Sequence, residues 1–349
     1  MKINLNGAAA VLLSAILFFL SSCSQVEPRF EHVLGTVCFV NLYEGGKEAY
    51  YDEIFARLQQ IHGEFSFAGS DSDIKKLREA DESEPVVVSD DAFTVLQTAQ
   101  RISEISGGAF DISIEPIVSL WKVNTDSPHV ATKAELDSLL PLVDYRNIIL
   151  NPEDKSVRFL KKGVEIDFGG IAKGFAADEI VKICKKHKIR RAVIDLGGNV
   201  YVYGKKKKTN FWNVGIKNPE YPDSAPLIKL TVPEISVVTS GTYERFFNDG
   251  EKRYHHILSP KDGWPVENEL YSVSVISRNS MLADGLTTAF FVLGTERSLE
   301  LLPKIREEFQ TELAAVFVQK DHEIIFSDDF PYACSILYDN WGNQKNPGE

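Results

Sequence analysis

The chain has 349 residues, of which 44% are hydrophobic and 25% charged, and its formal net charge at pH 7 is −12. This length suffices for one large domain or for two closely packed ones. The acidic balance argues against a nucleic-acid partner, because the phosphate backbone is bound by clusters of Lys and Arg.

The first residues have the pattern of a targeting segment. Lys2 precedes an apolar run over residues 8–20, which is too short to span a bilayer comfortably and is typical of a signal peptide. The junction Leu20-Ser-Ser-Cys23 resembles a bacterial lipoprotein signal. We therefore expect cleavage after residue 22 and a lipid anchor on Cys23, which would hold the protein on the periplasmic side of a bacterial membrane, with the inner membrane favoured. An ordinary secretory signal with an incidental cysteine is the alternative.

Helical and strand patterns alternate through residues 23–349, which we treat as one functional unit. The cysteines left after cleavage, Cys38, Cys184 and Cys334, are odd in number, so we expect no disulfide framework, although one incidental pair stays open. Periodicity predicts helices over 47–65, from Ser89 or Asp90 to Gly107, over 131–140, over 171–187 and from Asn279 to Gly294. It predicts strands over 32–42, 190–195, 200–203, 212–216, 227–232, 236–239 and 271–277.

The stretch from Val164 to Asp178 combines an alternating apolar run, Asp167, three glycines within six residues and Lys173. A strand that ends in Gly-Gly at a helix start exposes unpaired backbone N–H groups, and glycine lets a ligand approach them closely. The lysine adds a cation, so a phosphorylated ligand fits this stretch. A tight strand-to-helix turn without a ligand is the alternative.

Two other segments carry similar chemistry. Asp195-Leu-Gly-Gly198 repeats the Asp-x-Gly-Gly pattern, which suggests two backbone turns near a common site. Asp284 and Thr288 are four residues apart on a predicted helix and hence on one face. A carboxylate and a hydroxyl suit a hard cation such as Mg²⁺. Alternatively, Thr288 bonds its own helix backbone while Asp284 faces water.

Taken together, these segments resemble the ApbE family of FAD:protein FMN transferases. The resemblance covers residues 34 to about 294. Its most specific motifs are Gly108-Ala-Phe-Asp111, Asp167-Phe-Gly-Gly-Ile-Ala-Lys-Gly174, Asp195-Leu-Gly-Gly198, His256-Ile-Leu-Ser-Pro260 and Ala283-Asp-Gly-Leu-Thr-Thr288. It implies a compact α+β fold of two related, closely packed α/β parts with FAD bound between them.

The resemblance also implies an activity and partners. The family transfers the FMN moiety of FAD to a threonine hydroxyl of a target flavoprotein, such as a subunit of a respiratory redox pump, and releases AMP. Mg²⁺ is the implied cofactor and FAD the substrate. Phosphoryl transfer needs positioning and charge neutralisation rather than a protein nucleophile, which agrees with the residues present. An FAD pyrophosphatase, in which water replaces the threonine, and a non-catalytic periplasmic flavin carrier are the alternatives.

Site residues follow from the resemblance position by position. Those matching FAD contacts are Leu34, Ala109, Phe110, Asp111, Asp167, Lys173 and Leu258. Those matching metal ligands are Asp284, Thr288, the carbonyl of Gly170 and, in some members, Thr287.

The candidate general base is His256, with His255 as a competitor, because a histidine can accept a proton near neutral pH. Two positions depart from the family pattern. Ser259 replaces the usual aspartate, and the loop that often carries a flavin-stacking tyrosine offers Phe67 instead.

Overall fold

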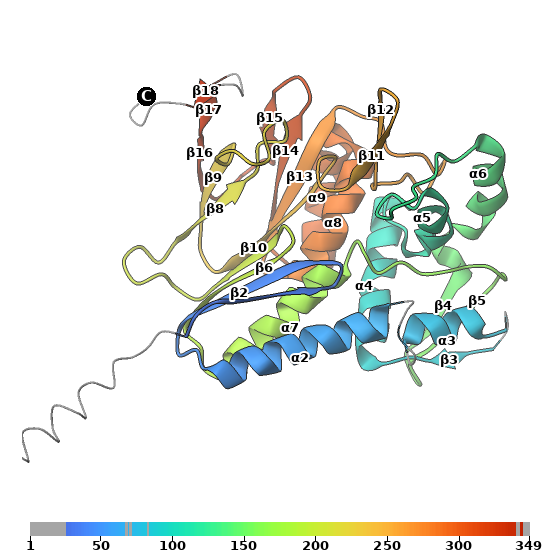
Figure 1. Cartoon of the computed structure of the whole chain (residues 1–349), viewed down its shortest axis with the longest axis horizontal. Coiled ribbons are helices and arrows are strands. Elements are labelled where there is room, and N and C mark those ends of the chain that lie inside the picture. Colours follow the sequence, from blue (N-terminus) through green and yellow to red (C-terminus); the bar gives the residue numbers. More distant parts are fainter. Residues whose placement is uncertain (1–25, 67–68, 70–71, 82–83, 340–342, 345–349) are drawn as a thin grey trace, which may run out of the picture.

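The computed structural model describes residues 26–66, 69, 72–81, 84–339 and 343–344. These residues form the predicted mixture of helices and strands around one eight-stranded sheet, in which every neighbouring pair is antiparallel (Figure 1). In spatial order its strands are β1 (Arg29–Val33), β2 (Thr36–Glu44), β6 (Arg191–Leu196), β7 (Asn199–Tyr203), β10 (Ile235–Gly241), β13 (Leu270–Ser277), β14 (Leu313–Gln319) and β15 (Ile324–Phe326).

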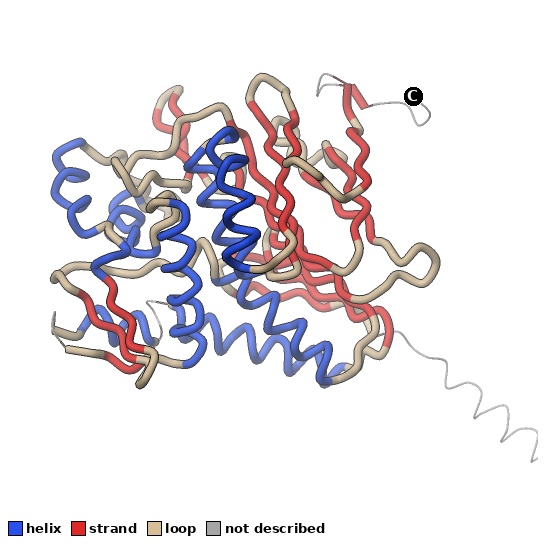
Figure 2. The backbone as a smooth tube through the Cα atoms, turned by 180° about the vertical axis from the view of Figure 1, so that it is seen from behind, coloured by secondary structure: helices blue, strands red, loops and turns tan. Residues whose placement is uncertain are grey.

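Long helices gather on one side of this sheet, as Figures 1 and 2 show from opposite directions. They are α2 (Glu48–Phe65), α4 (Asp90–Ser106), α7 (Ala172–Lys186), α8 (Ser280–Leu293) and α9 (Thr295–Phe309). Helix α2 buries one stripe, with Tyr51, Ile54, Leu58 and Ile61 spaced by three and four residues as the helical repeat requires. Helix α8 is buried on nearly all sides, since residues 282–287 are all buried. The helix stripes and the inner face of the sheet form the main hydrophobic core.

The opposite face of the sheet is also covered, by a three-stranded sheet of β8 (Trp212–Ile216), β9 (Ile228–Val232) and β16 (Ala333–Ile336). All seven residues of β14 are therefore buried. Its side chains alternate between two cores: Ala315 and Phe317 join the helix side, whereas Ala314 and Val316 join the other. Coverage on both faces explains why this strand reads as a continuous apolar run.

The remaining elements are short. They are α3 (Asp73–Glu79), β3 (Val86–Val87), α5 (Glu115–Trp121), α6 (Lys133–Leu139), β4 (Ile148–Asn151), β5 (Ser156–Phe159), β11 (Phe246–Asp249), β12 (Lys252–His255), β17 (Tyr338–Asp339) and β18 (Asn343–Gln344), with 3₁₀ turns at Ile112–Ile114, Leu140–Leu142 and Tyr145–Asn147. Helix α5 lies beside α4 on the side away from the sheet, and α6 lies beyond α5 at the edge of the molecule (Figure 1). The indole N–H of Trp121 donates to the carbonyl of Gly263 at 2.8 Å and ties α5 to the segment after β12.

Helices α4 and α8 begin and end at the capping residues predicted from the sequence. Ser89 accepts the N–H of Ala92 at the start of α4, and Gly107 ends that helix in the left-handed conformation. Asn279 accepts the N–H of Leu282 at the start of α8, and Gly294 ends it. These local rules are therefore confirmed.

Two expectations are wrong. Residues 32–42 are not one strand, because Leu34 and Gly35, with φ of 55° and 66°, form a tight turn between β1 and β2. The run before Asp167 is not a strand either. Val164 and Ile166 are buried as the alternation predicts, but among the described residues this run joins no sheet, and the N–H of Asp167 bonds the carbonyl of Ile112 instead.

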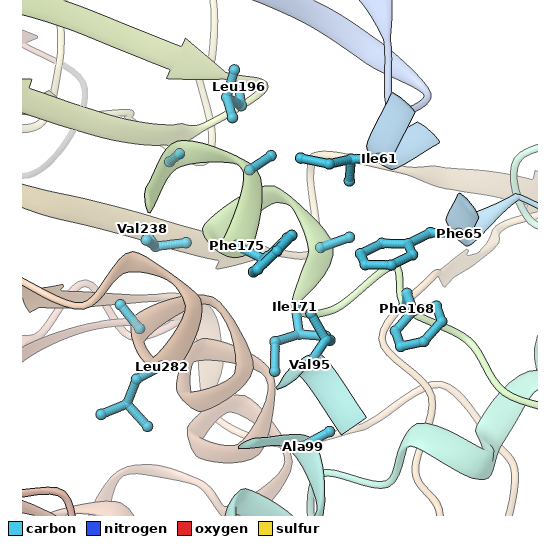
Figure 3. Close-up of a cluster of buried hydrophobic side chains, with 14 of the residues drawn as sticks. Ile61, Phe65, Val95, Ala99, Phe168, Ile171, Phe175, Leu196, Val238 and Leu282 are labelled. Atoms are coloured by element: carbon cyan, nitrogen blue, oxygen red, sulfur yellow. The ribbon is translucent and has the colours of Figure 1, made fainter. Parts of the chain in front are cut away.

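Helices α7 and α8 cross in close contact at Gly174, which has no side chain to separate the two backbones. A Cβ on Gly174 would lie 2.3 Å from the carbonyl oxygen of Ser280 and 2.7 Å from the Cβ of Asp284. Only glycine allows this approach, because any side chain would overlap backbone atoms. Ile171, Phe175 and Leu282 pack around the crossing (Figure 3).

No helix among the described residues has both the length and the apolarity to cross a bilayer. The signal peptide predicted over residues 1–22 and the lipidation site Cys23 lie outside the described part of the chain, so both stay predictions. The assignment of residues 23–349 to one domain also stays a prediction.

We predict that Gly174→Ala lowers the free energy of unfolding by about 1–3 kcal/mol, because the added methyl overpacks the helix crossing. The matched control is Gly63→Ala in α2, where a Cβ would meet nothing within 4 Å. That change should raise stability by up to about 1 kcal/mol through helix propensity. Urea unfolding measures both, and equal effects of the two substitutions would contradict the close crossing.

Candidate functional site

A cavity of about 380 Å³ lies where the helix side of the sheet meets the α5 region, and residues far apart in sequence line it. Of the residues singled out by sequence, it brings together Ala109, Phe110, Asp111, Asp167, Gly170, Lys173, His256, Leu258, Asp284 and Thr288. Parts of both Asp-x-Gly-Gly turns also line it, which confirms that they share a site.

Each turn is closed by its own aspartate. The carboxylate of Asp167 accepts the N–H of Gly169 at 2.7 Å, and that of Asp195 accepts the N–H of Gly198 at 3.0 Å. Gly197 has a φ of 64°, and a Cβ there would lie 2.1 Å from the hydroxyl of Thr36. The second turn therefore requires glycine both for its conformation and for its contact with the β1–β2 turn.

Asp111 organises the loop after α4. One carboxylate oxygen accepts the backbone N–H and the hydroxyl of Ser113, and the other accepts the N–H of Tyr145. Burial raises the pKa of Asp111, while these three hydrogen bonds favour its ionised form. The loop is thereby fixed with Ala109 and Phe110 on the cavity wall.

Oxygen atoms suited to a cation gather at one end of the cavity. Asp284 is 3% exposed, and one of its carboxylate oxygens accepts the N–H of Gly174 at 2.8 Å. Its other oxygen lies 3.6 Å from the Nζ of Lys173. Thr288 follows one turn later on α8, and its hydroxyl lies 3.5 Å from the position a Cβ on Gly170 would take. In the part of the chain that the structure describes, no three His, Cys, Asp or Glu side chains are placed to hold a metal ion together, so a cation here would have one carboxylate with hydroxyl and carbonyl oxygens.

Thr287 differs from its neighbour. It is fully buried, its hydroxyl donates to the carbonyl of Asp284 at 2.7 Å, and it lies 2.8 Å from the hydroxyl of Ser240. A hydroxyl bonded to its own helix backbone is the alternative for Thr288, but the residue that makes this bond is Thr287. It does not line the cavity, and its role as a metal ligand stays a prediction.

Other predicted positions lie beside the cavity or outside the described residues. Leu34 forms the β1–β2 turn, packs against the main core and does not line the cavity, although Gly35 and Thr36 do. Ser259 does not line the cavity, and its N–H is bonded to the carbonyl of Trp264 at 2.8 Å. Phe67, the candidate for flavin stacking, lies outside the described residues.

The charged residues on the cavity wall carry a surplus of negative charge. The carboxylates are Asp111, Asp167, Glu244 and Asp284, whereas the cations are Lys173 and Arg245. Burial raises the pKa of Asp167, while the N–H of Gly169 and the charge of Lys173 act in the opposite direction. An anionic ligand in this cavity would need an added cation to offset the repulsion.

The two neighbouring histidines have different environments. His256 lines the cavity, and its Nδ1 lies 3.1 Å from the carbonyl of Arg245. A carbonyl only accepts, so Nδ1 carries the proton and Nε2 holds the lone pair. His255 is buried, with Nε2 bonded to the carbonyl of Val266 and Nδ1 accepting the N–H of Ile257. Both nitrogens of His255 are used by the backbone, which favours His256 as the proton acceptor.

Sequence reasoning missed several cavity residues. Glu244 and Arg245 lie in a segment without a chemical motif, and Arg245 donates to the carbonyl of Gly35 at 3.1 Å. Glu115 was missed as well. It is 6% exposed and lines an adjoining cavity of about 330 Å³ that shares His256 with the first. Burial and the charge of Asp167 raise the pKa of Glu115 above its usual value. The sequence does not reveal this property, because it arises from tertiary contacts.

Comparisons with known proteins agree with this geometry. The sequence model of the ApbE family matches residues 34–316. An FAD:protein FMN transferase of Klebsiella pneumoniae is 34% identical over 296 residues, covering 84% of this chain and 90% of the relative. The protein of the same name from Treponema pallidum is 37% identical over 291 residues, covering 78% and 80%.

Solved structures share the fold. The crystal structure of the ApbE protein of Thermotoga maritima superimposes with a TM-score of 0.77 at 28% identity, covering 87% of this chain and 97% of that one. The flavin transferase ApbE of Vibrio cholerae gives a TM-score of 0.76 at 24% identity, with the same coverage. The α+β fold predicted from the sequence is therefore confirmed.

We predict that His256 stays neutral, as the Nδ1–H tautomer, from pH 8 to pH 5. Burial lowers the pKa of His256 to about 3, below the usual value of about 6.5. Its neutral form therefore contributes stability at neutral pH that is lost as pH falls from about 6.5 towards 3. Nitrogen NMR of the labelled histidine rings, assigned with His256→Asn, measures this, and a midpoint between pH 6 and 7 would contradict it.

Proposed function

The chain belongs to the ApbE family, and from this we propose that it is an FAD:protein FMN transferase. The observation that carries the proposal is the cavity in which the family motifs meet around Asp284, Thr288, Lys173 and His256. The family match over residues 34–316 and the two relatives of the same name support it. FAD is the substrate, and the acceptor is a threonine hydroxyl of a target flavoprotein, such as a subunit of a respiratory redox pump.

The reaction exchanges one phosphorus–oxygen bond for another. The acceptor oxygen bonds to the phosphorus next to riboflavin, and the bond from that phosphorus to the bridging oxygen of the pyrophosphate breaks. AMP leaves with the bridging oxygen, and the hydroxyl proton passes to a base. Such a transfer depends on positioning and on stabilising charge on the phosphate oxygens. Lys173 is the cation on the wall nearest to Asp284 and is suited to hold the pyrophosphate.

The donor atoms at Asp284 fit Mg²⁺. This ion takes few protein oxygens and completes its shell with water or phosphate, and the residues that would hold it are Asp284, Thr288 and the Gly170 carbonyl. When bound, Mg²⁺ supplies positive charge to the pyrophosphate oxygens. The surplus of carboxylates on the wall makes that charge necessary for an anionic substrate.

His256 is the group suited to accept the proton of the acceptor. The carbonyl of Arg245 holds Nδ1–H and leaves Nε2 as the basic nitrogen. Because the pKa of His256 is low in the protein without substrate, His256 is a weak base before substrate binds. The negative charge of a bound pyrophosphate would favour the imidazolium and raise that pKa.

The two alternatives give different products. An FAD pyrophosphatase would release free FMN and AMP, because water takes the place of the acceptor hydroxyl. A flavin carrier would leave FAD intact with Mg²⁺ and acceptor present. Flavin that remains with the acceptor protein after acid precipitation, together with released AMP, identifies the transferase.

We further propose that the mature protein works at the periplasmic face of a bacterial membrane, held by a lipid on Cys23. The support is the sequence junction at residues 20–23. In the described structure, the chain enters the fold at β1, the edge strand of the sheet, whose turn reaches the cavity through Gly35.

We predict that Asp284→Ala lowers FAD cleavage by about 10³-fold or more at ordinary Mg²⁺ concentration, while the protein stays folded. That loss corresponds to about 4 kcal/mol of transition-state stabilisation. The matched control is Asp137→Ala, which removes an exposed carboxylate on α6. Release of AMP measures cleavage, and excess chelator should reduce the wild type to the same level. Undiminished turnover by Asp284→Ala would rule out this metal site.

We predict that Cys23→Ser moves the protein from the membrane fraction to the soluble fraction, because the acyl anchor is lost. Membrane fractionation followed by immunoblotting measures this. The control is Cys334→Ser, which changes an exposed cysteine far from the amino terminus and should leave the distribution unchanged. Retention of Cys23→Ser on membranes would refute the anchor.

A further inference from the structure

Helices α7 and α8 are joined by two sets of hydrogen bonds that run in opposite directions. The carboxylate of Asp284 on α8 accepts the N–H of Gly174 on α7 at 2.8 Å. In return, Asp178 on α7 accepts the N–H groups of Ser280 and Met281 on α8 at 3.1 Å and 2.9 Å. Gly174 and Asp178 are four residues apart, as are Ser280 and Asp284, so the bonds lie one helical turn apart on both helices.

This arrangement fixes both the distance and the register of the two helices. Hydrogen bonds one turn apart on both helices oppose rotation and sliding of α8 more than a single bond would, and they add to the packing of α8 in the core. The absence of a side chain at Gly174 lets the backbones meet, with the prospective Cβ only 2.3 Å from the Ser280 carbonyl. A shift of α8 by a fraction of an ångström would therefore move Asp284 relative to Gly170 and Lys173, which lie at the start of α7.

The surroundings of Asp178 support a dedicated role. The hydroxyl of Ser280 donates to the side-chain oxygen of Asn199 at 2.9 Å and lies 2.8 Å from the hydroxyl of Ser236, so the start of α8 is also bonded to the sheet. Burial raises the pKa of Asp178 to about 6, while the hydrogen bonds from the N–H groups of Met281 and Ser280 favour its ionised form. A carboxylate at a helix amino terminus is stabilised by the unpaired N–H groups there.

We propose that Asp178 is a positioning residue for the cation site: it holds α8 in the register that places the Asp284 carboxylate beside Lys173 and the Thr288 hydroxyl beside Gly170. The inference rests on the proposed metal-dependent function. Asp178 does not line the cavity, so it acts through Asp284 and not by touching substrate. Residues that support a metal ligand typically contribute 10–100-fold to metal affinity.

A matched pair of substitutions separates positioning from simple helix capping. Asn279 is the N-cap residue of α8 itself, and its side chain accepts the N–H of Leu282 at 2.9 Å without contacting α7 through that bond. Asn279→Ala and Asp178→Ala both remove a cap from α8, and each should lower the urea midpoint of unfolding by a similar amount. Only Asp178→Ala removes a bond between α7 and α8.

The experiment is calorimetric titration of Mg²⁺ into the FAD-bound full-length protein. We expect Asp178→Ala to weaken Mg²⁺ binding by about 10-fold or more, and Asn279→Ala to leave it within about twofold of wild type. Asp178→Asn, which keeps the size and one acceptor oxygen, should weaken binding less and provides the test if Asp178→Ala does not fold. In cleavage assays, the Asp178 variants should raise the Mg²⁺ concentration for half-maximal rate and recover most of the maximal rate at saturating Mg²⁺.

Three results would overturn the inference. Equal Mg²⁺ affinity of wild type and the folded Asp178 variants would leave the proposed function intact but remove the positioning role. Equal weakening by Asn279→Ala and Asp178→Ala would reduce Asp178 to a helix cap. Absence of Mg²⁺ binding by the wild type with FAD would overturn the proposed metal site and, with it, the need for positioning.

Discussion

The contact on which the site depends is the crossing of α7 and α8 at Gly174. One helix begins directly after the Asp167 turn, and the other carries Asp284 and Thr288, so their separation decides whether these groups can act on one ligand. The crossing is close because glycine leaves the backbones bare, and the N–H of Gly174 also bonds the Asp284 carboxylate. A single residue thus supplies both the packing and an orienting hydrogen bond.

The rest of the fold holds this crossing in place. The antiparallel sheet packs against one side of both helices, and α2 and α4 cover the other, so the pair is enclosed in the main core. Loops complete the cavity from the outside, where Asp111 fixes one wall and Asp195 another. Rigid helices therefore carry the groups nearest the proposed metal, and glycine-rich turns carry backbone that a ligand can approach closely.

Much of the site could be predicted because its residues form local patterns. The spacing of Asp284 and Thr288, the glycines after Asp167 and the cap at Asn279 each follow from a rule within one element. Features set by tertiary contacts could not be predicted. The two-residue turn at Leu34 lacks the usual Asn-Gly or Asp-Gly sequence, and the run before Asp167 alternates without pairing in a sheet. Glu115 acquires its raised pKa only through burial beside Asp167.

In the proposed reaction, this cavity directs the phosphorus next to riboflavin to a protein hydroxyl. The most direct measurement uses FAD that carries radioactive phosphorus only at that position, incubated with the protein, Mg²⁺ and candidate acceptor flavoproteins. We expect the label to appear in an acid-stable bond to a threonine of the acceptor, with one unlabelled AMP released for each bound flavin. Label found only in free FMN, or only in intact FAD, would rule out transfer to a protein.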